Sequence, residues 1–487
     1  MPTTATDPTL IGIDIGTTAV KAVLLGRDGQ RRAAFSRPYP TRRPAEGRVE
    51  QDAGDWARLA REALALFAAH PDRGEVAGIG LTAQVGTHVF VGADLAPLAP
   101  AMVWQDTRAA AAGAALDARI APADKLAWLG APIPVDASHP LARMAWMATA
   151  APGTWARTAV VMQPKDYVAA SLTGQVAADP LSAIGMAGTD LRYAGALIAL
   201  VPGAAERLPP LVDPLAEVGR IAPGLPLAGT PVFTGTMDAW VSMLGLGVAA
   251  EGSAMYLSGT SEVMGIVSAT RLPEPGVVTF PGWAGITLHA GPTQAGGAAL
   301  VWVARLTGQD VGAAASGAAM PEATSPLFLP HLQGERAPLW DASARGTFAG
   351  LTLGDGAPEV TGAVLEGVAF AARLSFEALT RSAGLRPGLL RAGGGGMASD
   401  RWCKIRADAF GLPLQRMTGT DPGAVGAAVM AGAGSGLMAD LVQAAALLAT
   451  PEQLFTPDAG ASARADRRFA LWQELYAQIR PINAALA

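Results

Sequence analysis

The chain has 487 residues, of which 50% are hydrophobic and 16% are charged. This length exceeds one ordinary hydrophobic core, so we expect at least two domains, and the composition excludes a disordered protein. The net charge is -5 without a block of basic residues, which argues against nucleic acid as a partner. The single cysteine, Cys403, excludes an internal disulfide, and the N-terminus lacks the pattern of a secretory signal, so we expect a cytoplasmic protein.

The first predicted element is a β-hairpin over residues 10–30, with Gly16, Thr17 and Thr18 at its turn. Such a turn offers backbone N–H groups and two hydroxyls to a phosphate. Asp14 lies in the otherwise apolar strand before the turn, where an unpaired carboxylate would be costly. We therefore favour a role beside phosphates, where Mg²⁺ takes one or two protein carboxylates, over a role in stabilising the turn.

A helix over residues 55–70 and a buried strand over 76–84 follow, and this alternation predicts an α/β fold. Residues 231–247 then run from a strand to Asp238 and into a helix. Asp238 could cap that helix, or it could accept the proton of a hydroxyl during phosphoryl transfer. The local sequence alone favours the cap.

A second strand–turn–strand pattern, with Gly259 and Thr260 at its turn, occupies residues 253–270, about half a chain after the first. The repetition predicts a duplicated fold with domains 1–248 and 249–487. Four glycines at 393–396 precede a predicted helix and would let a ligand approach the backbone. Their order is not a dinucleotide fingerprint, and the chain has no Gly-Lys pair and hence no P-loop.

Residues 423–450 are rich in Ala and Gly and could be mistaken for a membrane span. Asp440 near the middle would cost about 2.5–3.5 kcal/mol inside a bilayer. We therefore predict two close-packed helices and no membrane association.

The chain resembles the FGGY carbohydrate kinases, the family of glycerol kinase and xylulokinase, along almost its whole length. The resemblance rests on motifs in the family's order, at residues 11–29, 47–56, 78–109, 164–186, 234–248, 258–261 and 394–402. The most specific is "GTFAGLTLGDGAPEVTGAVLE" at 346–366. The resemblance implies two duplicated ribonuclease H-like domains of the actin-like ATPase type, with a cleft between them, that use ATP and Mg²⁺.

The resemblance also implies roles for individual positions. Asp238 matches the general base, and Asp14 matches the carboxylate near Mg²⁺. The residues matched to the ATP phosphates are Gly16, Thr17, Thr18, Gly259 and Thr260. The residues matched to adenosine are Gly297, Gly394, Gly395 and Ser399. The residues matched to the sugar are Gln84, Trp104, Asp106 and Asp238, with domain packing as the alternative for Trp104 and Asp106.

The acceptor remains open. Residues 84–87 read Gln-Val-Gly-Thr, whereas glycerol kinases have Gln-Arg-Glu-Thr and xylulokinases have Gln-Met-His-Gly. His88 could replace the missing histidine. The "PKDY" and "GGGMASDRW" segments resemble xylulokinase more than glycerol kinase, so a ketopentose is favoured over glycerol, a tetritol or an autoinducer-type substrate.

The expected partner is thus a small sugar or polyol. The Ala/Gly-rich helices could also form the interface of a homodimer, although packing inside one chain explains them as well. The motifs argue against two other classes of protein. An actin- or Hsp70-like ATPase module without a small acceptor would have no use for the FGGY signature, and a non-catalytic sugar sensor would not need Asp14 and Asp238.

Overall fold

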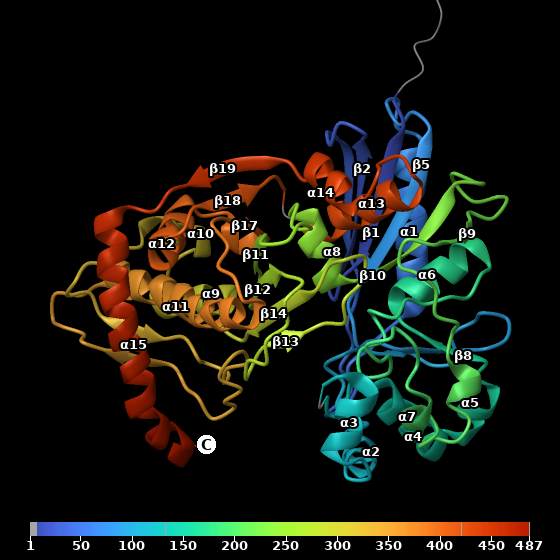
Figure 1. The fold of residues 1–487 in the computed structure, drawn as a ribbon, viewed down its shortest axis with the longest axis horizontal. Coiled ribbons are helices and arrows are strands. Elements are labelled where there is room, and N and C mark those ends of the chain that lie inside the picture. The colour runs from blue at the N-terminus through green and yellow to red at the C-terminus, as the bar shows by residue number, and fades with distance from the viewer. Residues whose placement is uncertain (1–6, 132, 420, 487) are drawn as a thin grey trace, which may run out of the picture. The chain divides into compact units, whose positions relative to one another are not determined.

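The computed structural model describes residues 7–131, 133–419 and 421–486, and Figure 1 shows its elements coloured along the chain. The chain folds into two compact units. Unit 1 contains the residues up to Gly245 together with Gly423–Ala449, and unit 2 contains Leu246–Pro422 and the residues from Thr450 onward. The first change of unit lies close to the predicted boundary at 248/249, but residues 423–449 pack with the N-terminal half.

Unit 1 is built on a sheet of strand order β3-β2-β1-β5-β10-β9. Its strands are β1 (Thr9–Ile15), β2 (Ala19–Gly26), β3 (Arg31–Pro38), β5 (Val76–Ala83), β9 (Glu217–Arg220) and β10 (Pro231–Met237). The pairs β4 (Glu50–Gln51) with β7 (Ala101–Met102) and β6 (Val89–Val91) with β8 (Val160–Met162) form two small sheets. Strands β1, β5 and β10 run parallel, so their carboxyl ends meet at one edge of the sheet.

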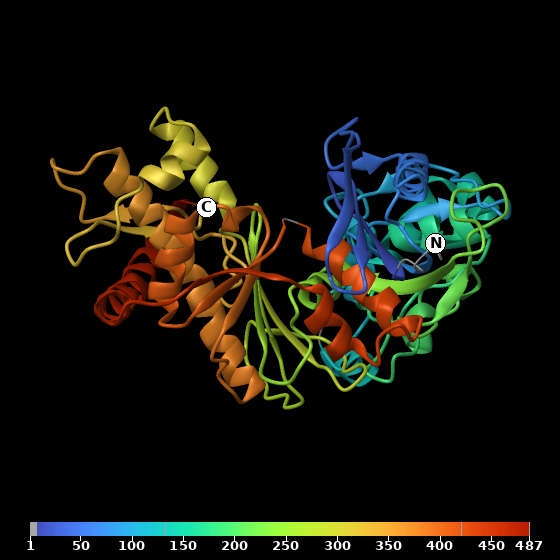
Figure 2. The same cartoon turned by 90° about the horizontal axis from the view of Figure 1, so that it is seen from above.

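The helices of unit 1 are α1 (Ala53–Ala68), α2 (Ala110–Asp117), α3 (Pro122–Leu129), α4 (Pro140–Ala150), α5 (Pro152–Arg157), α6 (Pro164–Thr173), α7 (Gly195–Ile198), α8 (Asp238–Gly245), α13 (Pro422–Gly434) and α14 (Leu441–Leu448), with a 3₁₀ turn at Ala205–Arg207. Alternate residues of β1, namely Ile11, Ile13 and Ile15, belong to the core formed with α1 and α6. The other face of β1 and β5 packs against α13, as Figure 2 shows for the red helices beside the blue strands.

Glycines explain why α13 lies so close to this sheet. A Cβ on Gly12 or Gly80 would lie 1.8 Å from a carbonyl oxygen of α13, and a Cβ on Gly426 would lie 1.7 Å from the carbonyl oxygen of Val241. The Ala/Gly-rich segment is therefore two close-packed helices, α13 and α14, as predicted. Among the helices the structure describes, none is long and apolar enough to cross a membrane.

Unit 2 repeats the plan with a sheet of order β13-β14-β12-β11-β17-β18-β19. Its strands are β11 (Ala254–Ser258), β12 (Glu262–Val267), β13 (Val278–Thr279), β14 (Leu288–Thr293), β17 (Leu390–Gly393), β18 (Leu414–Met417) and β19 (Pro451–Phe455), with β15 (Leu327–Leu329) and β16 (Thr347–Ala349) in a separate pair. In each unit an antiparallel hairpin is followed, after a helix, by a strand parallel to its first arm, namely β5 beside β1 and β17 beside β11. Both predicted hairpins are thus confirmed.

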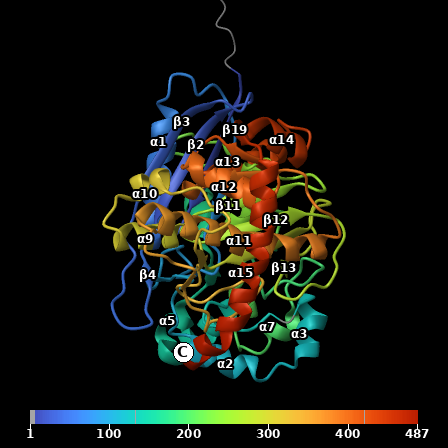
Figure 3. The ribbon, with the colours of Figure 1, turned by 90° about the vertical axis from the view of Figure 1, so that its left-hand side faces the viewer.

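The helices of unit 2 are α9 (Gly297–Leu306), α10 (Val311–Gly317), α11 (Ala357–Ala383), α12 (Asp400–Phe410) and α15 (Ala459–Leu486), with a 3₁₀ turn at Gly395–Met397. Helix α11 has buried residues on most of its circumference because it packs against β12, β14, α9 and α12. Figure 3 shows α15 running across the front of this unit. Its Phe469 and Trp472 are buried in the core with Phe370 of α11.

Candidate active site

In unit 1 three predicted site residues follow the carboxyl ends of three neighbouring parallel strands. Ile15, Ala83 and Met237 are the last residues of β1, β5 and β10, and they are register partners across the sheet. Gly16, Gln84 and Asp238 come next in the chain, so the predicted phosphate turn, the predicted substrate residue and the candidate base lie side by side. The carboxyl edge of parallel strands is where α/β proteins bind ligands.

Asp238 is the first residue of α8, directly after β10, and its side chain is partly buried. Burial raises the pKa of its carboxyl group to about 6, although the backbone N–H groups of Ala239 and of Asp238 itself oppose this shift. The Ala239 N–H donates to Oδ1 over 2.8 Å. Asp238 therefore stands at the predicted strand-to-helix junction, and burial raises the pKa of its carboxyl group toward the range of a general base.

Gly235 allows the end of β10 to pack closely against β5. Its φ is +66°, and a Cβ there would lie 1.7 Å from the carbonyl oxygen of Leu81 on β5. The register between β10 and β5 also shifts between Phe233 and Thr236. A side chain at position 235 would push β10 away from β5 and displace Asp238.

The turn after β1 is held by a chain of polar side chains. Tyr39 Oη donates to the Gly16 carbonyl, and Gln51 Nε2 donates to the Thr17 carbonyl over 2.8 Å. Gln84 Nε2 in turn donates to Gln51 Oε1 over 2.8 Å. Thr17 is half-buried, and Thr18 is exposed. The backbone of the turn is thus held by buried side chains, while Thr18 remains accessible to solvent.

Trp104 links the predicted sugar residues to the phosphate turn. Its indole Nε1 donates to the Thr17 hydroxyl over 3.2 Å, and 44% of its surface is exposed. Gln84 is 1% exposed, and its Oε1 has no hydrogen-bond partner among the described residues. An exposed apolar ring and a buried, unused acceptor are features of a ligand site.

Asp106 has partners that the sequence did not suggest. It is fully buried, its Oδ2 accepts from the Val49 N–H over 2.7 Å, and its two oxygens accept from the guanidinium of Arg108 over 2.6–3.0 Å. Arg108 also donates to Glu50 over 2.7 Å. These contacts favour domain packing for Asp106 over the sugar-hydroxyl acceptor expected from the resemblance.

His88 does not replace the histidine missing from residues 84–87. It is 4% exposed, and Arg143, itself fully buried, lies 2.9 Å from its Nδ1. The same guanidinium donates to the Gly86 and Val103 carbonyls over 2.6 Å. Burial and the Arg143 charge lower the pKa of His88 well below its ordinary value, so the ring is neutral and has a structural role.

Asp14 lies beside both the turn and α13. A Cβ on Gly423 would lie 2.5 Å from Asp14 Oδ2, so only glycine leaves room for this carboxylate at the start of α13. Within the described part of the chain, no three His, Cys, Asp or Glu side chains gather as a metal site. A single carboxylate still fits Mg²⁺, which keeps several waters and takes few protein ligands when it binds with phosphates.

In unit 2 the second turn and the glycine loop are neighbours across the sheet. Leu257 of β11 and Gly393 of β17 are register partners, so Gly259 and Gly394 leave the sheet at the same edge. Gly394 has φ +93°, and a Cβ on it would lie 2.4 Å from the Ser258 carbonyl oxygen. Gly259 and Thr260 are exposed.

Helix α9 begins directly on this turn. Gly297 N–H donates to the Gly259 carbonyl over 2.9 Å, and Ala298 N–H donates to the Thr260 carbonyl over 3.0 Å. A Cβ on Gly297 would lie 2.6 Å from the Gly259 oxygen. Gly297 therefore packs the helix onto the turn.

A cavity of about 1020 Å³ lies next to the glycine loop, entirely within unit 2. Its lining residues come from α9, α10, the glycine loop, α12 and β19, and they are Leu300, Val311, Gly312, Ala315, Ser316, Met320, Gly395, Gly396, Ala398, Ser399, Asp400, Arg401, Trp402, Lys404 and Phe455. The predicted residues Gly395 and Ser399 line it. The Ser399 hydroxyl accepts from the Trp402 N–H over 3.3 Å as the cap of α12, so Ser399 shapes the helix start beside the cavity.

Arg406, which no sequence motif singles out, connects the predicted phosphate turn of unit 2 with the glycine loop. It is fully buried and donates to the Gly396 carbonyl and the Ser258 hydroxyl, each over 2.8 Å. It also pairs with the fully buried Glu262 over 2.6 Å. The guanidinium thus ties the β11–β12 hairpin to the glycine loop.

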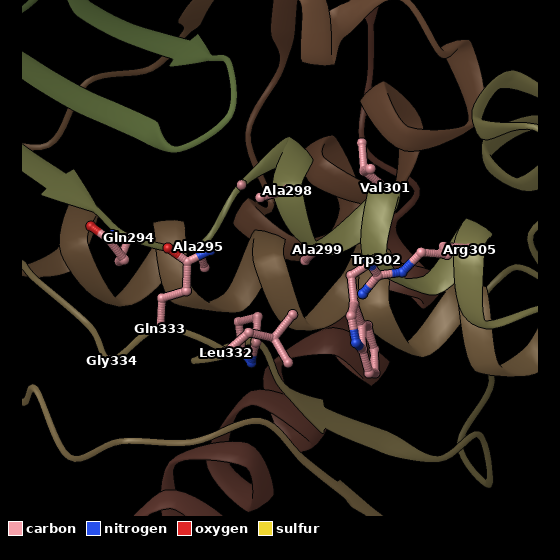
Figure 4. A pocket seen from close by; sticks show the side chains of 12 residues that line it. Gln294, Ala295, Ala298, Ala299, Val301, Trp302, Arg305, Leu332, Gln333 and Gly334 are labelled. Carbon is pink, nitrogen blue, oxygen red and sulfur yellow. The ribbon is translucent and has the colours of Figure 1, made fainter. Parts of the chain in front are cut away.

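A second cavity of unit 2, of about 370 Å³, lies on the other side of α9. Figure 4 shows Trp302 and Arg305 of α9 on one wall, with Gln294 near the start of the helix and Leu332 and Gln333 opposite. Gly296, next to the predicted Gly297, also lines it.

Comparisons with known proteins agree with this architecture. The N-terminal domain of the FGGY family of carbohydrate kinases matches residues 9–245, and the C-terminal domain of the same family matches residues 254–435. The chain therefore belongs to the FGGY family of carbohydrate kinases. It is an ATP-dependent kinase of a sugar or polyol, and the resemblance and the α/β fold of two actin-like ATPase domains are both confirmed.

Three individual proteins illustrate the range of relatives. A xylulose kinase from Escherichia coli K12 is 29% identical, covering 97% of this chain and 100% of the relative. A glycerol kinase from Aromatoleum aromaticum is 30% identical, and the match covers 90% of this chain and 92% of the relative. The crystal structure of a xyloylose kinase from Brucella ovis superposes with a TM-score of 0.87 at 29% identity, covering 97% and 100%.

Proposed function

We propose that this kinase phosphorylates a hydroxyl of a small ketose, most favourably a ketopentose, with Asp238 as the general base. The observation that carries the proposal is the place of Asp238, at the carboxyl edge beside the Gly16 turn and Gln84, with a pKa raised to about 6. At neutral pH such a carboxylate is largely ionised, yet it is more basic than an exposed aspartate. It can therefore accept the acceptor hydroxyl's proton as the bond to phosphorus forms.

Unit 1 is proposed to bind the sugar. Gln84 Oε1, buried and without a partner among the described residues, would accept a hydrogen bond from a sugar hydroxyl. The exposed face of Trp104 would pack against the carbon chain. Asp106 is assigned an indirect role, because its carboxylate already holds Arg108 and the Val49 N–H.

The residues proposed to contact phosphate groups are Gly16, Thr17 and Thr18 in unit 1 and, separately, Gly259 and Thr260 in unit 2, and of these Thr18, Gly259 and Thr260 are exposed. The cavity lined by Gly395 and Ser399 has the size and apolar walls of a nucleoside site and would hold the adenosine. Gly297 and Gly394 would act by close packing, since a side chain at either would collide with the phosphate hairpin.

Mg²⁺ is proposed to bind near Asp14. The bound ion would neutralise charge on the transferring phosphoryl group. Asp14 fits this role because it is a single carboxylate beside a phosphate-type turn, and the glycine at position 423 leaves it room.

The names of the relatives support a ketopentose, since several are xylulose kinases. Glycerol kinases among the relatives favour a polyol as the second candidate. Gly86 has φ +72°, and a Cβ there would be in van der Waals contact with Trp104 and Ser138, so this glycine lies packed beside the proposed sugar residue Trp104.

The test is a panel of D-xylulose, D-ribulose, L-ribulose, glycerol and erythritol, with ADP release measured at saturating Mg-ATP. We expect a ketopentose to raise turnover well above background hydrolysis. Asp238→Asn should lower kcat by about 10²- to 10⁴-fold, the usual size of general-base catalysis. Asp440→Asn, which changes an exposed cap of α14, serves as the matched control and should keep full activity. Stimulation by glycerol alone would favour the second candidate, and near-normal turnover of Asp238→Asn would exclude Asp238 as the base.

A further inference from the structure

A buried polar cluster lies directly behind the strand end that carries Asp238. We define it as Lys165, Asp166, Asp179, Ser182 and Thr236, each no more than 3% exposed. Lys165 and Asp166 begin α6, Asp179 and Ser182 lie in the loop that follows α6, and Thr236 is the penultimate residue of β10. Figure 1 shows α6 beside β10, and β10 leading into α8.

The cluster contains an ionic contact of one lysine with two aspartates. Lys165 Nζ lies 2.5 Å from Asp166 Oδ1 and 2.7 Å from Asp179 Oδ2. Burial alone would lower the pKa of Lys165, but the two carboxylates outweigh it and raise that pKa, so the ammonium is retained. The Leu181 and Ser182 N–H groups donate to Asp179 Oδ1 over 3.0 and 2.9 Å. Asp179 is therefore held on both of its oxygens.

The fixed Asp179 reaches β10 through one hydroxyl. Thr236 Oγ1 donates to Asp179 Oδ1 over 2.6 Å and lies 3.3 Å from the Ser182 hydroxyl. On the other side, the Thr82 hydroxyl of β5 donates to the Thr236 carbonyl over 2.7 Å. The residue two positions before Asp238 is thus clamped through its side chain and its backbone.

We infer that Thr236, held by Asp179 and Lys165, is a positioning residue that sets the place of the Asp238 carboxylate. This inference rests on the proposed role of Asp238. Hydrogen bonds hold Thr236 at both its hydroxyl and its carbonyl, and a displacement of about 1 Å at a reacting group can cost about 10²-fold in rate. This inference also explains the "PKDY" segment, because its Lys165 contacts Asp166 and Asp179, and Asp179 holds the hydroxyl of Thr236.

The matched variants are Thr236→Val, which keeps the shape and removes the hydroxyl, and Thr236→Ser, which keeps the hydroxyl. We expect Thr236→Val to lower kcat by about 10- to 100-fold with little change in KM for ATP or for the active acceptor. Thr236→Ser should stay within about threefold of the wild type. Equal activity of Thr236→Val and the wild type would overturn the inference.

A second comparison separates positioning of the base from general damage. In the Asp238→Asn background the base is absent, so adding Thr236→Val should lower the residual rate no further. A further loss as large as that in the wild-type background would overturn the inference. If Asp238→Asn itself kept full turnover, the proposed function would fail instead, and the two failures are therefore distinguishable.

If Thr236→Val does not fold, Ser182→Ala replaces it. This change removes the weaker contact to the Thr236 hydroxyl and leaves the Lys165–Asp179 pair in place. We expect kcat to fall severalfold, again only when Asp238 is present. No fall in kcat would overturn the inference.

Discussion

Replacing Asp238 by asparagine should raise the stability of the folded protein while it lowers turnover. The pKa of Asp238 is raised from 3.8 to about 6, chiefly by burial. At about 1.4 kcal/mol for each pKa unit, the ionised group costs at most about 3 kcal/mol above pH 6. The side chain is only partly buried, so solvent screening reduces this to about 1–2 kcal/mol. An asparagine carries no charge, and its Oδ1 can still accept the Ala239 N–H.

The pH dependence of the stability gain shows whether burial of the charged carboxylate causes it. The folded pKa lies above the unfolded value, so the wild type loses stability as pH rises from about 4 to 6. The advantage of Asp238→Asn should therefore be absent near pH 4 and complete near pH 7. Thermal unfolding, followed at several pH values, should show a rise in Tm of about 2–4 °C for each kcal/mol at pH 7.

The exposed cap variant Asp440→Asn is the control and should show no such pH-dependent gain. A fall in Tm of Asp238→Asn at pH 7 would refute the reasoning, because the carboxylate would then be worth more as a helix cap than it costs by burial. A gain of equal size at pH 4 and pH 7 would also refute it, because desolvation of the charge would not be the cause.

Three further predictions concern both units. Catalytic efficiency toward the acceptor should fall about tenfold for each pH unit below about 6, because protonated Asp238 cannot accept a proton. The measurement is the pH dependence of the rate at saturating ATP, and a rate that does not change with pH would contradict this prediction. Gly394→Ala should weaken ADP binding measured by calorimetry, because a Cβ at position 394 would collide with the Ser258 carbonyl. Gly395→Ala should be tolerated structurally, because a Cβ at position 395 has nothing within 4 Å. Arg406→Met should lower Tm by an amount equivalent to about 3–5 kcal/mol, since it leaves Glu262 buried without its partner, and an unchanged Tm would contradict this.

Much of the fold was predictable because its local signals are strong. Alternating apolar residues and Gly-Thr turns predict the β1–β2 and β11–β12 hairpins, and helical spacing predicts α1. Asp238 was also predicted at a strand-to-helix junction, which the structure confirms. These elements depend on residues close together in the chain.

What the sequence did not reveal depends on contacts between distant residues. Helix α13 is buried on most of its circumference, so its pattern shows no preferred face and does not predict that it returns to β1 and β5. The bond between Thr236 and Asp179 joins residues 57 positions apart. Arg108 stands two residues after Asp106, but the sequence does not say whether that carboxylate serves a sugar or its neighbouring arginine.

The return of residues 423–449 to unit 1 affects how the protein is made on the ribosome. During synthesis the first 245 residues emerge without the helix that fits Gly12 and Gly80, so one face of their nascent sheet is exposed until α13 is translated. The N-terminal unit therefore completes its core only after residues 246–422 of unit 2 have been translated. A fragment ending at Gly245 should expose apolar surface and aggregate, and coexpression of a peptide spanning 422–449 should restore its solubility.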